Sequence, residues 1–272
     1  MRMTPVWKFE DIHWSLFDPS QVDPAIMKII KAGSVVERNG FDYGKYLKNV
    51  FKGDQEFTQA IASWELDEVK HGEVLAAWVH LADPDYDFDK AFAKFSAGYK
   101  IPVDVNESVR GSRASELLAR CFVEIGTSSF YSAVKDKATE PLLKEICSRI
   151  AADELRHYKL FYTHFKRYQK DENLSLWARL KIMFGRLFET RDEELSYAYY
   201  AANNEPGEFD HKKYLKAYTQ KVYGFYGRPH IDQAMALLCK AVGLPPQGLI
   251  KTFFSKLVYT VLKIARPKEK NN

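Results

Sequence analysis

The sequence is poor in cysteine and lacks long apolar runs, and both absences narrow what the protein can be. Its 272 residues include three cysteines, Cys121, Cys147 and Cys239, whose spacing fits neither a metal motif nor a disulfide framework. A reducing compartment is therefore expected, and we predict a cytoplasmic location. No run of eighteen apolar residues occurs, so no helix is expected to span a membrane. The first ten residues also lack the apolar segment of a secretory signal.

Positive charge is scarce outside the C-terminal end. Residues 249–272 contain six Lys and Arg against one Glu, a net charge of +5, whereas the whole chain carries +4. The preceding 248 residues therefore sum to −1 (4 minus 5), which argues against a basic nucleic-acid-binding body. Hydrophobic residues make up 46% of the chain, enough for a large core, so one domain with an extension is expected.

One short motif occurs twice, as Glu68-Val-Lys-His71 and as Glu154-Leu-Arg-His157. Residues three apart lie on one face of a helix, and each pair falls on the apolar stripe of its predicted helix. Ionisable side chains directed into a core are costly unless a partner neutralises them, and a bound cation is such a partner. A single copy would be weak support, because most such pairs are solvated. The two copies together predict a metal site.

Two further glutamates complete the pattern of a di-metal carboxylate bundle, in which two helices each supply a Glu and two supply Glu-x-x-His. Glu37 lies 31 residues before Glu68, and Glu124 lies 30 residues before Glu154. Helix-breaking residues lie midway in both intervals. Antiparallel arms of ~15 residues, roughly 23 Å long, would bring the four glutamates to one level. The alternative is a bundle whose buried carboxylates meet by chance, although buried carboxylates are rare without partners.

The predicted fold class is all-α, since no alternating strand pattern occurs. We expect an N-terminal arm (1–22), a four-helix bundle (23–170), a helical extension packed on it (171–248) and a basic amphipathic tail (249–272). The expected bundle helices cover 24–51, 54–81, 112–138 and 141–170, with a long crossover between the second and third. Further helices are expected over 174–202, 209–224, 229–242 and 247–265.

Three segments resemble the acyl-acyl carrier protein desaturase family of soluble, ferritin-like di-iron enzymes. They are Trp64-Glu-Leu-Asp-Glu-Val-Lys-His-Gly72, Phe122-Val-Glu-Ile-Gly-Thr127 and Ile150-Ala-Ala-Asp-Glu-Leu-Arg-His157. Glu37 followed by Tyr43 is also similar to the family's first helix. The Glu124-x-x-Thr127 pattern and the 56 residues between Glu68 and Glu124 favour desaturases over rubrerythrin-like proteins. The paired Cys-x-x-Cys sites of a rubredoxin module do not occur.

The resemblance implies a ferritin-like four-helix bundle that binds two Fe2+ ions per chain. The implied ligands are Glu68 and Glu154 as bridging carboxylates, with Glu37, Glu124, His71 and His157 as terminal ligands. Thr127 would place a hydroxyl near the oxygen-binding side, and Asp153 would hold the tautomer of a histidine. The alternative for Asp153 is an ordinary acid on the helix surface. Carboxylate-rich ligation with one imidazole per metal suits iron or manganese.

The function implied by the resemblance is oxygen-dependent insertion of a double bond into a carrier-bound fatty acyl chain. Acyl carrier protein or another acyl thioester, a ferredoxin-like electron donor and a second copy of the chain are the implied partners. The ligands alone do not separate desaturation from hydroxylation. Two alternatives stay open: another di-iron oxygenase, a hydroxylase or N-oxygenase, acting on a small molecule, and a rubrerythrin- or ferritin-like protein that handles iron or peroxide.

Two further features have competing interpretations. Gly33, Gly40 and Gly44 lie near Glu37 on one predicted helix face, where missing side chains could leave a groove for an acyl chain. Close helix packing or a local helix irregularity is the alternative. In the tail, apolar residues at helical spacing could dock on the bundle. The tail's lysines could also attract an acidic carrier or an anionic membrane surface.

Overall fold

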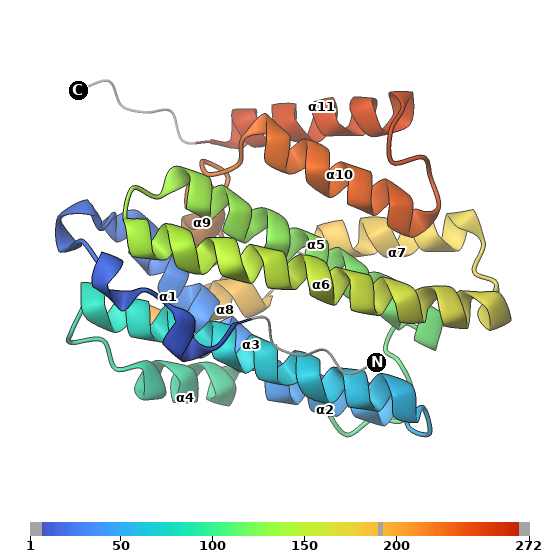
Figure 1. Cartoon of the computed structure of the whole chain (residues 1–272), viewed down its shortest axis with the longest axis horizontal. Helices are drawn as coiled ribbons and strands as arrows, with labels where there is room; N and C mark the ends of the chain where they lie inside the picture. The colour runs from blue at the N-terminus through green and yellow to red at the C-terminus, as the bar shows by residue number, and fades with distance from the viewer. Residues whose placement is uncertain (1–6, 190–192, 267–272) are drawn as a thin grey trace.

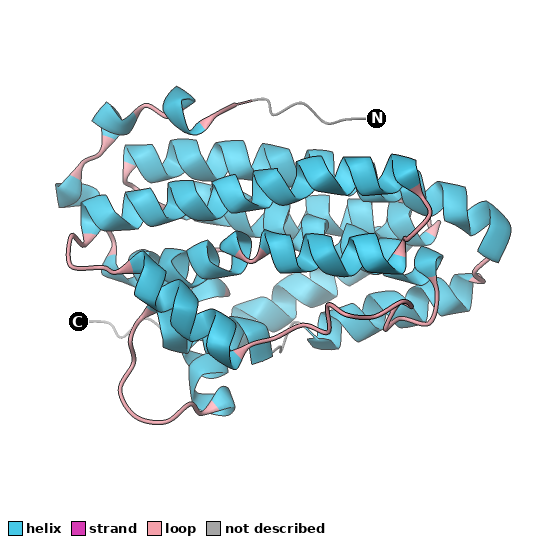
Figure 2. Cartoon of the chain, turned by 90° about the horizontal axis from the view of Figure 1, so that it is seen from below, coloured by secondary structure: helices cyan, strands magenta, loops and turns pink. Residues whose placement is uncertain are grey.

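The computed structural model describes residues 7–189 and 193–266, and within these ranges the chain is all-helical. Figure 2 shows helices joined by loops, and no strand occurs in the described part of the chain. Four long segments form the centre of the molecule (Figure 1): α1 (Pro24–Arg38) continued by α2 (Gly40–Val50), α3 (Gln55–Ala82), α5 (Arg113–Lys137) and α6 (Pro141–Glu172). α4 (Phe88–Gly98) lies in the crossover between α3 and α5.

The helices begin where the sequence supplies capping groups. Asp23 accepts hydrogen bonds from the backbone of residues 25 and 26, with Pro24 as the first residue of α1. Asp54 caps α3 and Ser112 caps α5 in the same way. Glu140 caps α6, and its second oxygen accepts a hydrogen bond from the indole of Trp78, 2.7 Å away on α3. Glu140 therefore joins the start of α6 to α3.

The central helices are arranged in two antiparallel pairs, α1–α2 with α3 and α5 with α6, and α3 also packs against α6. The sequence predicted one helix over 24–51, but the structure ends α1 at Arg38 and begins α2 after Asn39. Glycines permit the close approach to α3. A Cβ added at Gly72 would lie 2.6 Å from the backbone nitrogen of Arg38, and one at Gly40 would lie 2.5 Å from the Cβ of Glu68. The chain therefore enters the site with its backbone pressed against α3.

The N-terminal segment forms three short 3-10 helices, η1 (Phe9–Asp11), η2 (Trp14–Leu16) and η3 (Pro19–Gln21). Trp7 and Ile12 are buried, and both join the core formed by α1, α3, α5 and α6. Residues 1–6 of the expected arm lie outside the described residues.

The C-terminal part adds α7 (Leu176–Glu189), α8 (Glu193–Ala202), α9 (His211–Val222), α10 (Arg228–Val242) and α11 (Leu249–Ala265). α8 and α9 pack against α1, and α7 and α10 pack against α5. The expected range 174–202 corresponds to α7 and α8, with 190–192 outside the described residues. Among the described helices, none is long and apolar enough to cross a bilayer. The expected docking of the tail holds for Phe254 and Val258, whereas Phe253 and Leu257 on the same helix are exposed.

Candidate metal centre

The four glutamates and two histidines predicted as metal ligands lie together in the core. They form two groups of potential ligand atoms, each with all its atoms within 4.8 Å of one another. The first group is Glu37, Glu68, His71 and Glu154, and the second is Glu68, Glu124, Glu154 and His157. Glu68 and Glu154 belong to both groups, which is the position that a carboxylate bridging two metal ions occupies.

Both histidines direct the same ring nitrogen at the glutamates. The Nδ1 atom of His71 lies 3.2 Å from an oxygen of Glu154 and 3.6 Å from Glu37. The Nδ1 atom of His157 lies 3.0 Å from Glu68 and 3.5 Å from Glu124. The two imidazole centroids are 5.8 Å apart. The centre is therefore pseudo-symmetric, with one imidazole and one unshared carboxylate on each side.

The other nitrogen of each histidine meets an aspartate from the opposite motif. The Nε2 atom of His71 lies 3.0 Å from Oδ2 of Asp153 on α6, and that of His157 lies 3.4 Å from Oδ2 of Asp67 on α3. A carboxylate that accepts the Nε2 proton fixes the tautomer in which Nδ1 keeps its lone pair for a metal. Asp153 thus lies where its predicted role requires, whereas Asp67 was not predicted.

Two cations stabilise these aspartates behind the histidines. Lys70 Nζ lies 2.8 Å from Asp67 and 3.2 Å from Asp153. Arg156 donates a short hydrogen bond to Asp153 and lies 3.6 Å from Asp67. Trp7 covers the network, because its ring stacks on His71 and lies 4.0 Å below Lys70 Nζ. The repeated motif is therefore Asp-Glu-x-Lys/Arg-His, and each of its four named positions has a counterpart across the α3–α6 interface.

The donor set fits a pair of divalent cations. Five buried atoms facing the centre make no hydrogen bond to any described residue: Glu37 Oε2, Glu68 Oε1, His71 Nδ1, Glu154 Oε1 and His157 Nδ1. Buried polar atoms in native proteins normally have partners, so these atoms mark a place for a ligand of positive charge. Four carboxylates would balance two divalent ions.

The pKa values of the metal-free centre show how strongly it holds positive charge. Burial and repulsion from Glu154 and Glu37 raise the pKa of Glu68 to about 8. Burial also raises the pKa of Glu124 well above its usual range. Burial opposes protonation of His71 and His157, yet hydrogen bonds to their aspartate and glutamate neighbours raise both pKa values. Protons therefore replace metal in the metal-free protein.

Two hydroxyl groups from α5 orient the glutamates. Thr127 Oγ1 lies 2.6 Å from Oε2 of Glu154, and Tyr131 donates a hydrogen bond of 2.6 Å to Oε1 of Glu37. Thr127 was predicted to be near the centre, whereas Tyr131 was missed. The spacing offered a signal, because Tyr131 follows Glu124 by two helical turns and so shares its face of α5.

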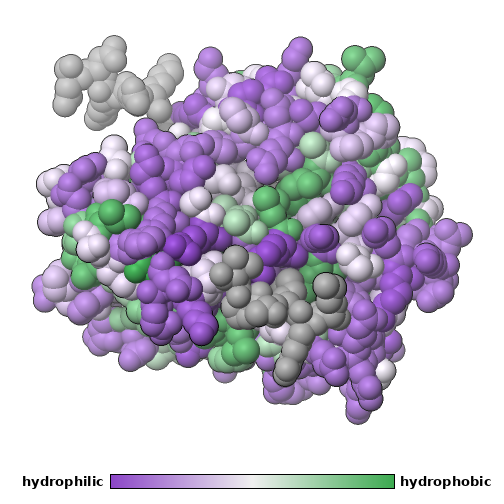
Figure 3. Space-filling model, viewed as in Figure 1, coloured by the Kyte–Doolittle hydropathy of each residue, from purple (hydrophilic) through white to green (hydrophobic). Residues whose placement is uncertain are grey.

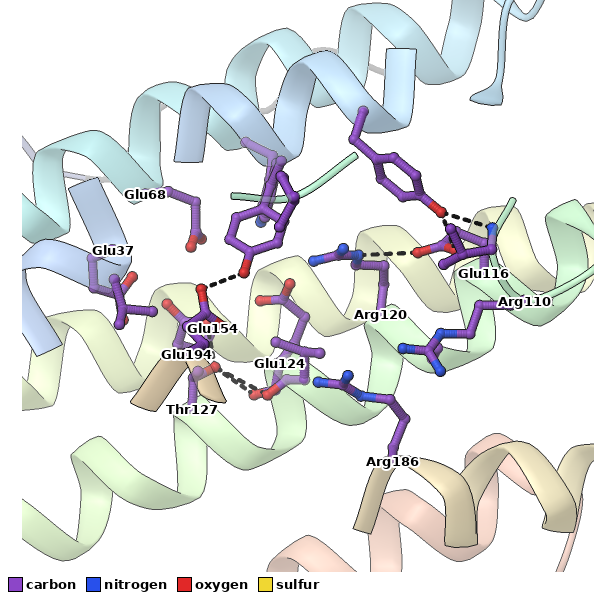
Figure 4. Close-up of a pocket in the computed structure, with 18 of the residues that line it drawn as sticks. Glu37, Glu68, Arg110, Glu116, Arg120, Glu124, Thr127, Glu154, Arg186 and Glu194 are labelled. Atoms are coloured by element: carbon purple, nitrogen blue, oxygen red, sulfur yellow. Dashed lines mark hydrogen bonds and ion pairs between the residues drawn. The ribbon is translucent and has the colours of Figure 1, made fainter. Parts of the chain in front are cut away.

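A cavity of 320 Å³ opens beside the centre (Figure 4). Its lining includes all four glutamates and Thr127, whereas the two histidines lie outside it. Figure 4 shows Glu37, Glu68 and Glu154 toward one end and Arg110, Arg120 and Arg186 toward the other. A molecule in this cavity would meet the carboxylate side of the centre.

The arginine end of the cavity was not predicted. Glu116, Arg120 and Glu124 are spaced four residues apart on α5, so they share one helix face, and this spacing was available in the sequence. Arg120 Nε lies 3.4 Å from Glu116, which also accepts a hydrogen bond from Tyr46. Tyr43 on α2 bonds to Glu194 on α8, and Arg120 lies over the Tyr43 ring.

The three glycines predicted to form an acyl groove do not line this cavity. Gly40 and Gly44 pack against side chains of α3, and a Cβ on Gly33 would lie 3.4 Å from the Tyr131 hydroxyl. Their role in the structure is close helix packing, because it leaves no open groove beside Gly40 and Gly44.

Comparison with known proteins adds no assignment. No protein-family model matches the chain, and no curated protein matches it in sequence. The function must therefore be argued from the centre and its cavity.

Proposed function

We propose that this protein is a di-iron oxidoreductase that uses oxygen to oxidise an organic substrate, and that its central helices form a ferritin-like four-helix bundle. The observation that carries the proposal is the pair of ligand groups sharing Glu68 and Glu154. Each group adds one imidazole and one further carboxylate, a donor set that suits iron or manganese rather than a thiolate-preferring ion. The long crossover through α4 supports the bundle topology.

When bound, two ferrous ions would supply electrons to dioxygen beside the cavity. The protein's own residues bind and orient. Asp153 and Asp67 hold the histidine protons on Nε2, so that Nδ1 faces the metals. Tyr131 fixes Glu37, and Thr127 presents a hydroxyl where Glu154 meets the cavity. Burial of the centre excludes bulk water from the reacting side.

Desaturation of a carrier-bound acyl chain is the reaction that the resemblance in the three motif segments supports. It would remove two hydrogens from the substrate and reduce dioxygen to two waters, with two electrons from an external donor such as a ferredoxin-like protein. Acyl carrier protein or another acyl thioester would deliver the substrate.

Oxygenation of a smaller polar molecule is a second candidate, which the cavity favours. A volume of 320 Å³ lies at the low end of ligand pockets, roughly 300–1,000 Å³. Three arginines, Glu116 and Glu194 line it together with aromatic side chains. A hydrocarbon chain packed against these groups would desolvate them without replacing their hydrogen bonds to water, whereas a polar substrate could form such bonds.

Product analysis distinguishes these reactions. Iron-loaded protein with a reductant and oxygen would be offered acyl-carrier thioesters and a panel of small aromatic and aliphatic acids. An unsaturated acyl product supports desaturation, and a hydroxylated or N-oxygenated acid supports the second candidate. Hydrogen peroxide consumption with no oxidised product from any substrate would contradict both and favour a peroxide-handling protein. The variant Glu154→Ala serves as the inactive control.

A further inference from the structure

One side of α11 contacts the rest of the molecule and the opposite side does not. Ser255 is buried, and Phe254, Val258 and Leu262 pack against the core through α10. Lys251 also points to the body, where its Nζ lies 3.1 Å from Asp232. α11 is thus held firmly along its length as the outermost helix in Figure 1.

The other side of α11 is apolar and exposed. Leu249 is 89% exposed, Phe253 61% and Ile264 79%. The residues of this outer face are Leu249, Ile250, Phe253, Leu257, Val261 and Ile264. At 100° per residue they span roughly a third of the helix circumference over its full length. Figure 3 shows apolar surface at the upper right, where α11 begins. Contiguous apolar surface of this kind on a soluble protein marks an interaction site.

The charge beside the outer face has one sign. Residues 249–266 contain three lysines and Arg266 but no Asp or Glu. Lys256 and Lys263 are exposed and two helical turns apart, so they lie on the same edge of the outer face. Lysines at such an edge can extend their charged ends toward anionic groups while their stems cover apolar surface.

We propose that the outer face of α11 binds an anionic lipid surface, with the helix lying in the plane of the membrane. An exposed apolar face bordered by lysines fits the boundary between headgroups and acyl chains. A second copy of the chain fits less well, because two such helices would bring lysines together with no acid on either helix to pair them. An acidic soluble protein would match the lysines but would not require six exposed apolar side chains.

The test measures co-sedimentation of the whole protein with phosphatidylcholine vesicles, with and without a third of phosphatidylglycerol. We expect binding to the anionic vesicles that weakens as salt rises. The double change Phe253→Ser and Leu257→Ser should reduce partitioning at least tenfold, and Lys256→Glu with Lys263→Glu should remove the preference for anionic lipid. These side chains point to solvent, so the variants should fold. The folds would be compared by circular dichroism and bound iron.

Matched changes elsewhere separate the outer face from a general effect of composition. Leu81→Ser, at an exposed apolar position on α3, controls for lost apolar surface, and Lys52→Glu with Lys90→Glu controls for charge. Both controls should bind vesicles as the wild type does. Absence of binding to anionic vesicles would overturn the proposal, as would wild-type binding by the serine variant. A dimer in sedimentation equilibrium that the serine variant loses, without any vesicle binding, would assign the outer face to self-association instead.

Discussion

Replacing Asp153 by Asn tests whether the crossed aspartates control the metal ligands. The Asp153 carboxylate accepts from His71 at 3.0 Å and contacts Lys70 at 3.2 Å and Arg156. Burial opposes its ionised form, but the hydrogen bond from His71 and the nearby cations hold its pKa well below the usual range, so it is ionised at neutral pH. Asparagine keeps the shape and removes the charge. The His71 tautomer then loses its strongest constraint.

Two effects of known scale should follow. Loss of a carboxylate behind a metal-bound histidine typically weakens metal binding about 10- to 100-fold, or about 1.4–2.8 kcal/mol. Removing one partner from a buried ionic network costs about 3–5 kcal/mol, and the lower end is expected here because Asp67 still contacts Lys70. The metal-free protein should therefore unfold at lower urea concentration, with an unchanged slope.

Anaerobic calorimetry with ferrous iron measures the affinity, and urea unfolding of metal-free protein measures the stability. Asp67→Asn should show the same changes to a smaller degree, since its distance to His157 is 3.4 Å rather than 3.0 Å. Asp89→Asn, an exposed acid on α4, is the matched control and should change neither quantity. Iron affinity of Asp153→Asn equal to that of wild type would refute the positioning role.

Three further predictions follow from the site and its packing. Iron affinity should rise with pH up to about 8, because the raised pKa of Glu68 means that metal must displace a proton; calorimetry in buffers of different ionisation enthalpy should detect proton release, and none would be observed if the site bound metal already deprotonated. Gly72→Ala should destabilise the protein by about 1–3 kcal/mol, since its Cβ would lie 2.6 Å from α1 backbone. Gly126→Ala, with open space around it, should instead stabilise by about 1 kcal/mol, and equal unfolding midpoints for the two variants would contradict the packing account. Arg120→Gln should leave bound iron unchanged while raising the KM of the true substrate at least about tenfold, and an unchanged KM would remove this residue from substrate binding.

The sequence predicted the helices and the six candidate ligands well because both depend on local spacing. Apolar residues repeating every three or four positions located α3, α5 and α6 to within two residues at each end. The Glu-x-x-His spacing placed both ligands of each pair on an inward face. The equal intervals from Glu37 to Glu68 and from Glu124 to Glu154 predicted that the two halves would meet at one level.

The features that were missed depend on contacts between distant segments. Asp67 meets His157 across 90 residues, and no local pattern shows which helix it will face. The break at Asn39 arises where α2 packs against α3, so helix propensity alone did not locate it. The cavity combines side chains of α2, α5, α7 and α8. On α11, periodicity predicted an amphipathic helix, but only the structure shows that its most apolar side faces outward.

Metal stoichiometry tests the central claim most directly. Protein loaded anaerobically with ferrous iron, desalted and assayed for iron should contain about two ions per chain, as two ligand groups sharing Glu68 and Glu154 require. Glu154→Ala should lose both ions, because the carboxylate belongs to both groups, while its helical content stays that of wild type. One iron per chain in the wild type, or two in Glu154→Ala, would contradict a di-iron centre at this site.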